Sequence, residues 1–136
     1  MTLVQLLPWV SGLAFAAALV ALALRDPAAP PIRGIWRLPA LLCLLFLLWS
    51  LATVAMEGPF GFWTEHTRNM WGNQIWFDLL LAGSCAWALI LPRARALGMN
   101  PFPWLVLILA SGCIGFLAMF ARLLLLEERR ARPAGA

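Results

Sequence analysis

Residues 3–24 read LVQLLPWVSGLAFAAALVALAL and contain no charged side chain. About 20 apolar residues in a helix, rising 1.5 Å each, cross a hydrocarbon core of about 30 Å. A helix is expected because in lipid only helices and closed barrels satisfy every backbone polar group. A cleaved signal peptide is the alternative, but no basic residue precedes the run, which is longer than the usual signal core. We therefore predict a membrane-spanning helix here.

Three further apolar runs follow along the chain, at residues 40–56, 71–91 and 104–126. The run at 40–56 is short, and it spans a bilayer if Pro39 and Glu57 lie at the two interfaces or if the bilayer thins locally. Together the four runs predict an all-α, polytopic membrane protein with four transmembrane helices in a small bundle.

The composition agrees with this class, since the 136 residues are 63% hydrophobic and only 12% charged. A soluble domain has about a quarter of its residues charged. A cytosolic enzyme, a nucleic-acid-binding module and a disordered tail are therefore excluded. We expect an integral protein of the bacterial inner membrane that contacts membrane lipids. Its single domain, residues 1–136, would include an interfacial loop at 57–70 and a basic C-terminal tail at 127–136.

All ten basic residues are arginines, and most lie near the ends of the apolar runs, where arginine anchors helices in the headgroup layer. If four helices cross, loops 25–39 and 92–103 lie at one end of the bundle, which we call end A. Both termini and loop 57–70 then lie at the other end, end B. The arginines divide almost evenly, so the positive-inside rule determines the orientation only weakly. The arginine-free N-terminal flank favours a cytoplasmic end A.

The three cysteines, Cys43, Cys85 and Cys113, all fall inside apolar runs, and none belongs to a C-x-x-C pair. Their number and spacing predict neither a disulfide framework nor a zinc site, and we expect small buried hydrophobic side chains. A single histidine cannot supply a bis-histidine metal site, and the chain has no nucleotide-binding or hydrolase motif. We predict no metal and no cofactor, other than a bound carotenoid or lipid.

Two charged residues lie inside the predicted spans, where charge is costly and marks a functional candidate. Asp78 lies about two turns into the third run, and Arg122 about one turn before the end of the fourth. Because antiparallel helices would bring them to similar depth, we expect them to form an ion pair. Small residues on the same stripes, which allow close helix packing, support this contact. They are Ala82, Cys85, Ser111, Gly115 and Ala118.

Further polar residues gather at the same predicted end B, among them Gln5, Glu57, Arg68 and Asn69. In one interpretation, the Asp78–Arg122 pair only locks two helices and the loop residues are solvated. In the other, a headgroup or acid/base site forms at the mouth of an apolar cleft. The catalytic candidates are then Asp78, His66 and Glu65. The ligand-binding candidates are Trp63, Trp71, Asn73, Gln74, Asp78 and Arg122.

The stretch WGNQIWFDL at residues 71–79, then PRARALGM at 92–99, GCIG at 112–115 and Arg122, resembles a group of small four-helix membrane proteins. These are the abscisic-acid-deficient-four-like proteins, associated in plants with neoxanthin formation, and related bacterial families. Their pattern reads W-x-H-x-x-x-F-D-L and G-P-x-G. The matching residues are Trp71, Phe77, Asp78, Leu79, Gly112 and Gly115. This chain has Asn73 where the family has His, and Cys113 where it has Pro.

The resemblance implies a four-helix membrane protein connected with carotenoids or other isoprenoids. Our first hypothesis is a protein that binds or chemically modifies such a long apolar ligand; whether it is an enzyme stays open. The alternative is a non-catalytic accessory subunit of a larger membrane complex, or a homo-oligomer. A transporter is less favoured, because one ion pair and no repeat of broken helices offer little substrate path.

Overall fold

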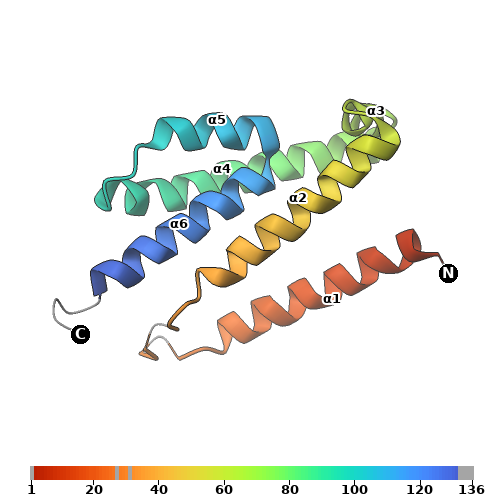
Figure 1. Cartoon of the computed structure of the whole chain (residues 1–136). Coiled ribbons are helices and arrows are strands. Elements are labelled where there is room, and N and C mark those ends of the chain that lie inside the picture. The colour runs from red at the N-terminus through yellow and green to blue at the C-terminus, as the bar shows by residue number, and fades with distance from the viewer. Residues whose placement is uncertain (1, 27, 31, 132–136) are drawn as a thin grey trace. The chain divides into compact units, whose positions relative to one another are not determined.

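The computed structural model describes residues 2–26, 28–30 and 32–131, and these residues form helices joined by turns. The chain divides into two compact units, the first ending at Ile32 and the second beginning at Arg33. The prediction of an all-α chain is confirmed. The described helices are α1 (Leu3–Ala23), α2 (Arg37–Glu57), α3 (Gly61–Thr67), α4 (Met70–Ala96), α5 (Pro101–Ser111) and α6 (Cys113–Ala131) (Figure 1).

Helix α1 makes up most of the first unit and matches the predicted run at 3–24 to within one residue. Its N-terminus is capped where the Thr2 backbone N–H donates to Gln5 Oε1 at 2.9 Å. After the helix, Asp26 Oδ1 accepts from the Ala28 N–H at 2.8 Å, which closes a local turn. The helix has the length and apolar composition needed to cross a membrane.

In the second unit, α2 and α4 are also long and apolar enough to span. Helix α2 begins at Arg37, three residues before the predicted run at 40–56. The run alone was short for a span, but the 21 residues of the helix are enough. Helix α4 has 27 residues, about 40 Å of helix. That length exceeds the thickness of a hydrocarbon core, which is about 30 Å.

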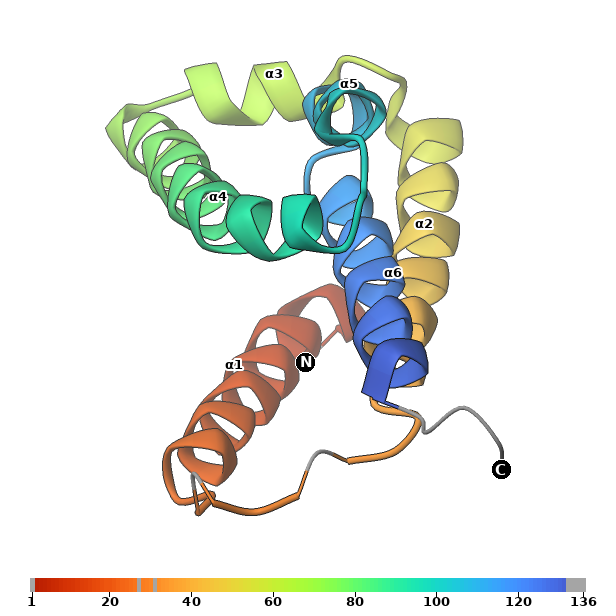
Figure 2. The ribbon, with the colours of Figure 1, turned by 90° about the vertical axis from the view of Figure 1, so that its left-hand side faces the viewer.

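The predicted fourth span at 104–126 is wrong, because the chain breaks at Gly112 into α5 and α6. Gly112 has φ +57° and ψ −121°, a conformation that residues with a side chain rarely adopt. A Cβ atom on Gly115 would lie 2.7 Å from the backbone N of Ile108. In one continuous helix these residues would be about 10 Å apart along the axis. Helices α5 and α6 are therefore the two arms of a hairpin (Figures 1 and 2).

The hairpin reverses the predicted direction of the last helix, so α6 runs parallel to α4. Arg93 near the end of α4 donates to both carboxylate oxygens of Glu127 near the end of α6, at 3.0 and 2.8 Å. Arg130 donates to the Ala96 carbonyl at 3.3 Å. The Gly34 N–H, just before α2, donates to Glu128 Oε2 at 2.8 Å. End A, where α2 begins and α4 ends, thus also holds the end of α6.

The small buried core of the second unit also lies toward end A. It comprises Ala94, Met99, Met119 and Leu123, which come from the end of α4, the turn after it and α6. Helix α2 packs along the other side of α6, where the Cys43 thiol donates to the Ile114 carbonyl at 3.5 Å. Nearer the middle of α4, Gly83 faces the ring of Phe116 on α6.

At end B, the predicted loop 57–70 contains the short helix α3, which packs on the beginning of α4. The contact is close at Gly72, where a Cβ atom would collide with the Glu65 carbonyl oxygen. The predicted tail at 127–136 is also partly helical, since α6 continues to Ala131. Residues 132–136 of that prediction lie outside the described residues.

Candidate functional site

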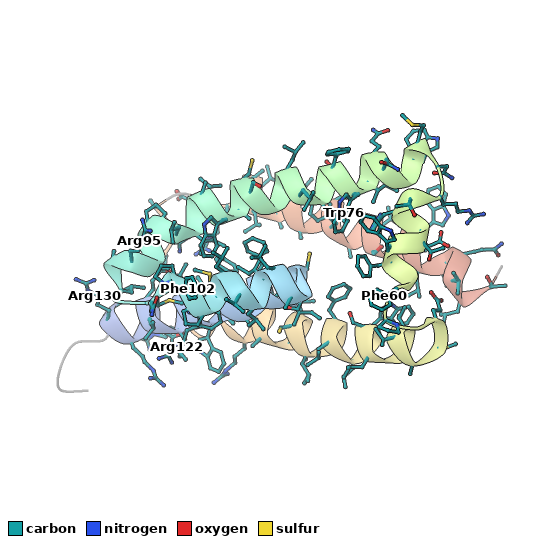
Figure 3. All side chains as sticks on the ribbon, turned by 90° about the horizontal axis from the view of Figure 1, so that it is seen from above. Phe60, Trp76, Arg95, Phe102, Arg122 and Arg130 are labelled. Carbon is teal, nitrogen blue, oxygen red and sulfur yellow. The ribbon has the colours of Figure 1, made fainter. Side chains whose placement is uncertain are left out.

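Helix α4 has an inward face, toward the rest of the second unit, and an outward face. On the inward face, the Trp76 ring lies 4.8 Å from the His66 ring and 6.1 Å from that of Phe62, centroid to centroid, on α3 (Figure 3). Ala94, further along this face, is fully buried. Asp78 comes two residues after Trp76, about 200° around the helix. Its side chain is exposed on the outward face.

The outward face of α4 carries a shallow hollow of about 310 Å³ around Asp78. Gln74 lies one turn before Asp78 on the same stripe, so two polar side chains share the hollow. All of its lining comes from α4, so it has one wall and is open opposite that wall. Asp78 follows the N-cap Asn69 by nine residues, about 13 Å along the axis of a helix long and apolar enough to span a membrane. The lining residues are Trp71, Gln74, Ile75, Phe77, Asp78 and Leu81.

A second hollow, of about 270 Å³, adjoins the first and shares Trp71 and Ile75 with it. It lies where α3 meets the start of α4, at end B, so the two hollows follow each other along α4 from this end toward its middle. Its remaining lining residues are polar apart from a glycine: Glu65, His66, Arg68, Asn69 and Gly72.

Local hydrogen bonds fix the shape of this second hollow. Asn69 caps α4 by accepting the Gly72 N–H at 2.9 Å. The Asn73 amide donates to the His66 carbonyl at 3.0 Å, and His66 Nδ1 lies 3.3 Å from the Gly72 carbonyl oxygen. Glu65 pairs with Arg68 at 3.3 Å in an exposed position. These bonds join α3 to α4, so the polar groups keep a defined position beside Trp71.

The structure therefore brings together only part of the predicted set. Trp71, Gln74 and Asp78 share the first hollow, and Glu65 and His66 lie in the second. His66 packs against Trp76 on the inward face of α4, whereas Asp78 faces outward, so the acid/base cluster imagined from the sequence does not assemble. The predicted residues that line neither hollow are Trp63, Asn73 and Arg122.

The expected ion pair between Asp78 and Arg122 is wrong. Because α6 runs parallel to α4 and Glu127 meets Arg93, Arg122 lies about level with residue 88 of α4. That is about ten residues, or 15 Å, from Asp78. Within residues 2–26, 28–30 and 32–131, the ion pairs are Arg93–Glu127 and Arg68–Glu65.

The hairpin also explains how the two charged residues differ. Arg122 is exposed five residues before Glu127, and in a bilayer its long side chain could extend toward the headgroups at end A. Asp78 has a short side chain, lies deeper along its helix, and makes no hydrogen bond or ion pair with the part of the chain that the structure describes. Asp78 is thus the charge in this unit that most needs a partner from outside it.

Sequence reasoning missed Ile75, Phe77 and Leu81 as lining residues. Helical spacing could have found two of them, because Ile75 and Leu81 lie three residues before and after Asp78. The expectation of buried cysteines is wrong for Cys85 and Cys113, which are exposed, whereas Cys43 is half-buried. Among the described residues, no three His, Cys, Asp or Glu side chains come close enough to hold a metal ion.

Comparison with known proteins adds no further assignment: no family model, curated protein or solved structure matches the chain. The resemblance carried by Trp71, Phe77 and Asp78 therefore stays a prediction.

Proposed function

We propose that this protein binds, within the membrane, a long apolar molecule with a polar end group, lying along the outward face of α4. A carotenoid or other isoprenoid is the ligand class we favour, and the bacterial inner membrane is the location. The observation that carries the proposal is Asp78, which lies within a helix long and apolar enough to span, in a hollow that Trp71 and Phe77 help to line, and lacks a partner among the described residues.

The energetic argument starts from the cost of this carboxyl group. A charged residue at the centre of a membrane helix costs roughly 2.5–3.5 kcal/mol on insertion scales. A ligand hydroxyl that donates to Asp78 reduces this cost. Gln74, one turn away, offers both a donor and an acceptor to the same ligand group. Trp71 and Phe77 supply flat apolar surface for the ligand's chain on either side.

The second hollow extends this site toward end B. A ligand with a further polar group meets Arg68 and Asn69 there, in the headgroup layer. Three residues that carry the family resemblance, Trp71, Phe77 and Asp78, also line the first hollow, which favours an isoprenoid. The proposal is limited to binding, because His66 and Asp78 lie on different faces of α4.

Ligand retention tests the proposal. The protein would be purified in mild detergent with a dihydroxylated carotenoid, and separately with a carotenoid hydrocarbon that has no polar group. We expect stoichiometric retention of the first and much weaker retention of the second. Asp78→Leu should lose the retained ligand. Ser84→Ala, a matched control that removes a hydroxyl bound to the Leu80 carbonyl outside both hollows, should keep it. Equal retention of both carotenoids, or full retention by Asp78→Leu, would contradict the proposal.

An accessory subunit or homo-oligomer is the second candidate, and the single wall of the first hollow favours it. The outward stripe of Asp78 continues to Ala82 and the exposed Cys85, small residues that let another helix approach. A donor on that partner helix would then pair with Asp78. Native electrophoresis in mild detergent distinguishes the two candidates. A monomer with no co-purifying protein would exclude the subunit, whereas a complex disrupted by Asp78→Leu would support it.

A further inference from the structure

The α5–α6 hairpin changes how the arginines are divided between the two ends of the second unit. With α6 returning to end A, six arginines gather there against two glutamates, Glu127 and Glu128. End B of this unit has Arg68 against Glu57 and Glu65. Apart from Arg122 within α6, a continuous fourth helix would divide the described arginines of this unit four to three between end A and end B, and the hairpin makes that division six to one in favour of end A. The six are Arg33, Arg37, Arg93, Arg95, Arg129 and Arg130.

The two glutamates at end A are already engaged. Glu127 takes both hydrogen bonds of Arg93, and Glu128 accepts the Gly34 N–H. Arg95 and Arg129 are exposed and form no ion pair within the described part of the chain. Their guanidinium groups are therefore available to an anion from outside the protein.

The same end of the unit carries an exposed aromatic side chain. Arg95 at the end of α4, Arg130 at the end of α6 and Phe102 at the start of α5 all lie toward this end (Figure 3). Phe102 is 68% exposed. An exposed aromatic ring at the end that carries the arginines suits the boundary between acyl chains and phosphate groups.

We propose that end A lies on the cytoplasmic side of the membrane and binds the phosphate groups of anionic phospholipids. Cytoplasmic flanks of membrane helices carry the excess of arginine and lysine, and end A has that excess. The planar guanidinium group binds phosphate oxygens through paired hydrogen bonds. A zwitterionic lipid has the same phosphate group but no net negative charge, so we expect it to bind these arginines more weakly. The end of α6 is then cytoplasmic, opposite to what a continuous fourth helix requires. The inference is independent of the ligand site, which lies toward end B.

Reporter fusions test the orientation. Green fluorescent protein fused to the C-terminus of the whole chain should fluoresce in a bacterial host, and alkaline phosphatase fused there should be inactive, because each reporter functions on one side of the membrane only. In a variant lacking the three native cysteines, a membrane-impermeant maleimide should label Glu57→Cys in intact cells and Arg129→Cys only after cell disruption. An active phosphatase fusion, or the reverse labelling, would overturn the orientation.

Lipid binding is tested by thermal stability of the purified protein in mild detergent. Added phosphatidylglycerol should raise the melting temperature, whereas phosphatidylcholine and inorganic phosphate should not. Combining Arg95→Gln with Arg129→Gln should remove at least half of that rise, and Glu57→Gln at end B, outside both hollows, should leave it unchanged. Equal rises with both lipids, a rise with phosphate alone, or an equal loss in Glu57→Gln would refute the binding of anionic lipid at this surface.

Discussion

End A and end B of the second unit differ in what holds their helices together. At end A, a buried core of Ala94, Met119 and Leu123 is reinforced by the Arg93–Glu127 pair between the same two helices. At end B, α3 packs on the start of α4, and the outward face beside this contact is left open around Asp78. At end A a charged pair thus joins two helices, whereas toward end B the carboxylate of Asp78 has no partner among the described residues.

The largest effect should come from breaking the hairpin that creates this contrast. In Gly115→Val, the new side chain meets the backbone of Ile108, which cannot move without separating α5 from α6. We expect a loss of about 3 kcal/mol or more, measured as the melting temperature and the folded yield in detergent. Gly12→Ala is the control, because a Cβ atom there meets nothing within 4 Å. Equal behaviour of the two variants would refute the hairpin.

A smaller and more local effect is expected at end B from Gly72→Ala. The added methyl group collides with the Glu65 carbonyl, so α3 should detach from α4 while end A stays folded. We expect about 1–3 kcal/mol of local destabilisation, measured as faster hydrogen exchange across residues 61–72. Gly83→Ala, which meets only the Phe116 ring at 3.4 Å, should leave that exchange unchanged. Uniformly faster exchange over the whole unit would show that the two ends do not behave separately.

The ion pairs offer a finer comparison of the two ends. A double-mutant cycle with Arg93→Gln and Glu127→Gln should give a coupling of about 0.5–1 kcal/mol, because the pair is bidentate and its side chains are only 49% and 35% exposed. The matched pair Arg68–Glu65, at 69% and 63% exposure, should give less than about 0.5 kcal/mol. Urea unfolding in detergent measures both. A stronger coupling at end B would reverse the comparison.

The smallest effect is the coupling between Asp78 and Arg122, which a continuous fourth helix would make large. Residues this far apart without shared partners have additive effects to within about 0.3–0.5 kcal/mol. We expect Asp78→Ala and Arg122→Ala to add within that range when combined, as measured by melting temperature. Recovery of stability in the double variant, by more than this range, would mean that the two charges are paired after all.

The elements that the sequence predicted well are those that depend on composition alone. The uncharged runs at 3–24 and 40–56 correspond to α1 and α2, because a lipid-facing helix needs only length and apolar side chains. The prediction of one span at 104–126 was wrong, although this apolar run is also long enough to cross a bilayer. Its break depends on the φ of Gly112 and on the packing of Gly115 against Ile108, which hydropathy does not register.

The candidate site was also predicted only in part: its charged residue was found from composition, but its surroundings depended on the helix directions. Asp78 stood out because charge inside a span is costly, and Gln74 and Trp71 were named with it because they lie toward the same predicted end B. Its supposed partner Arg122 was inferred from helix direction, so that inference failed together with the fourth span. Helix α3 was missed because its seven residues mix polar and aromatic side chains without a clear period.

The most direct test of the hairpin is cross-linking of cysteine pairs in a variant without Cys43, Cys85 and Cys113. With a short bis-maleimide, the pair Arg93→Cys with Glu127→Cys should cross-link within one chain, and the pair Asp78→Cys with Arg122→Cys should not. A continuous fourth helix would separate residues 93 and 127 by about 30 Å along the axis and reverse both results. Efficient cross-linking of 78 to 122 without that of 93 to 127 would therefore contradict the account.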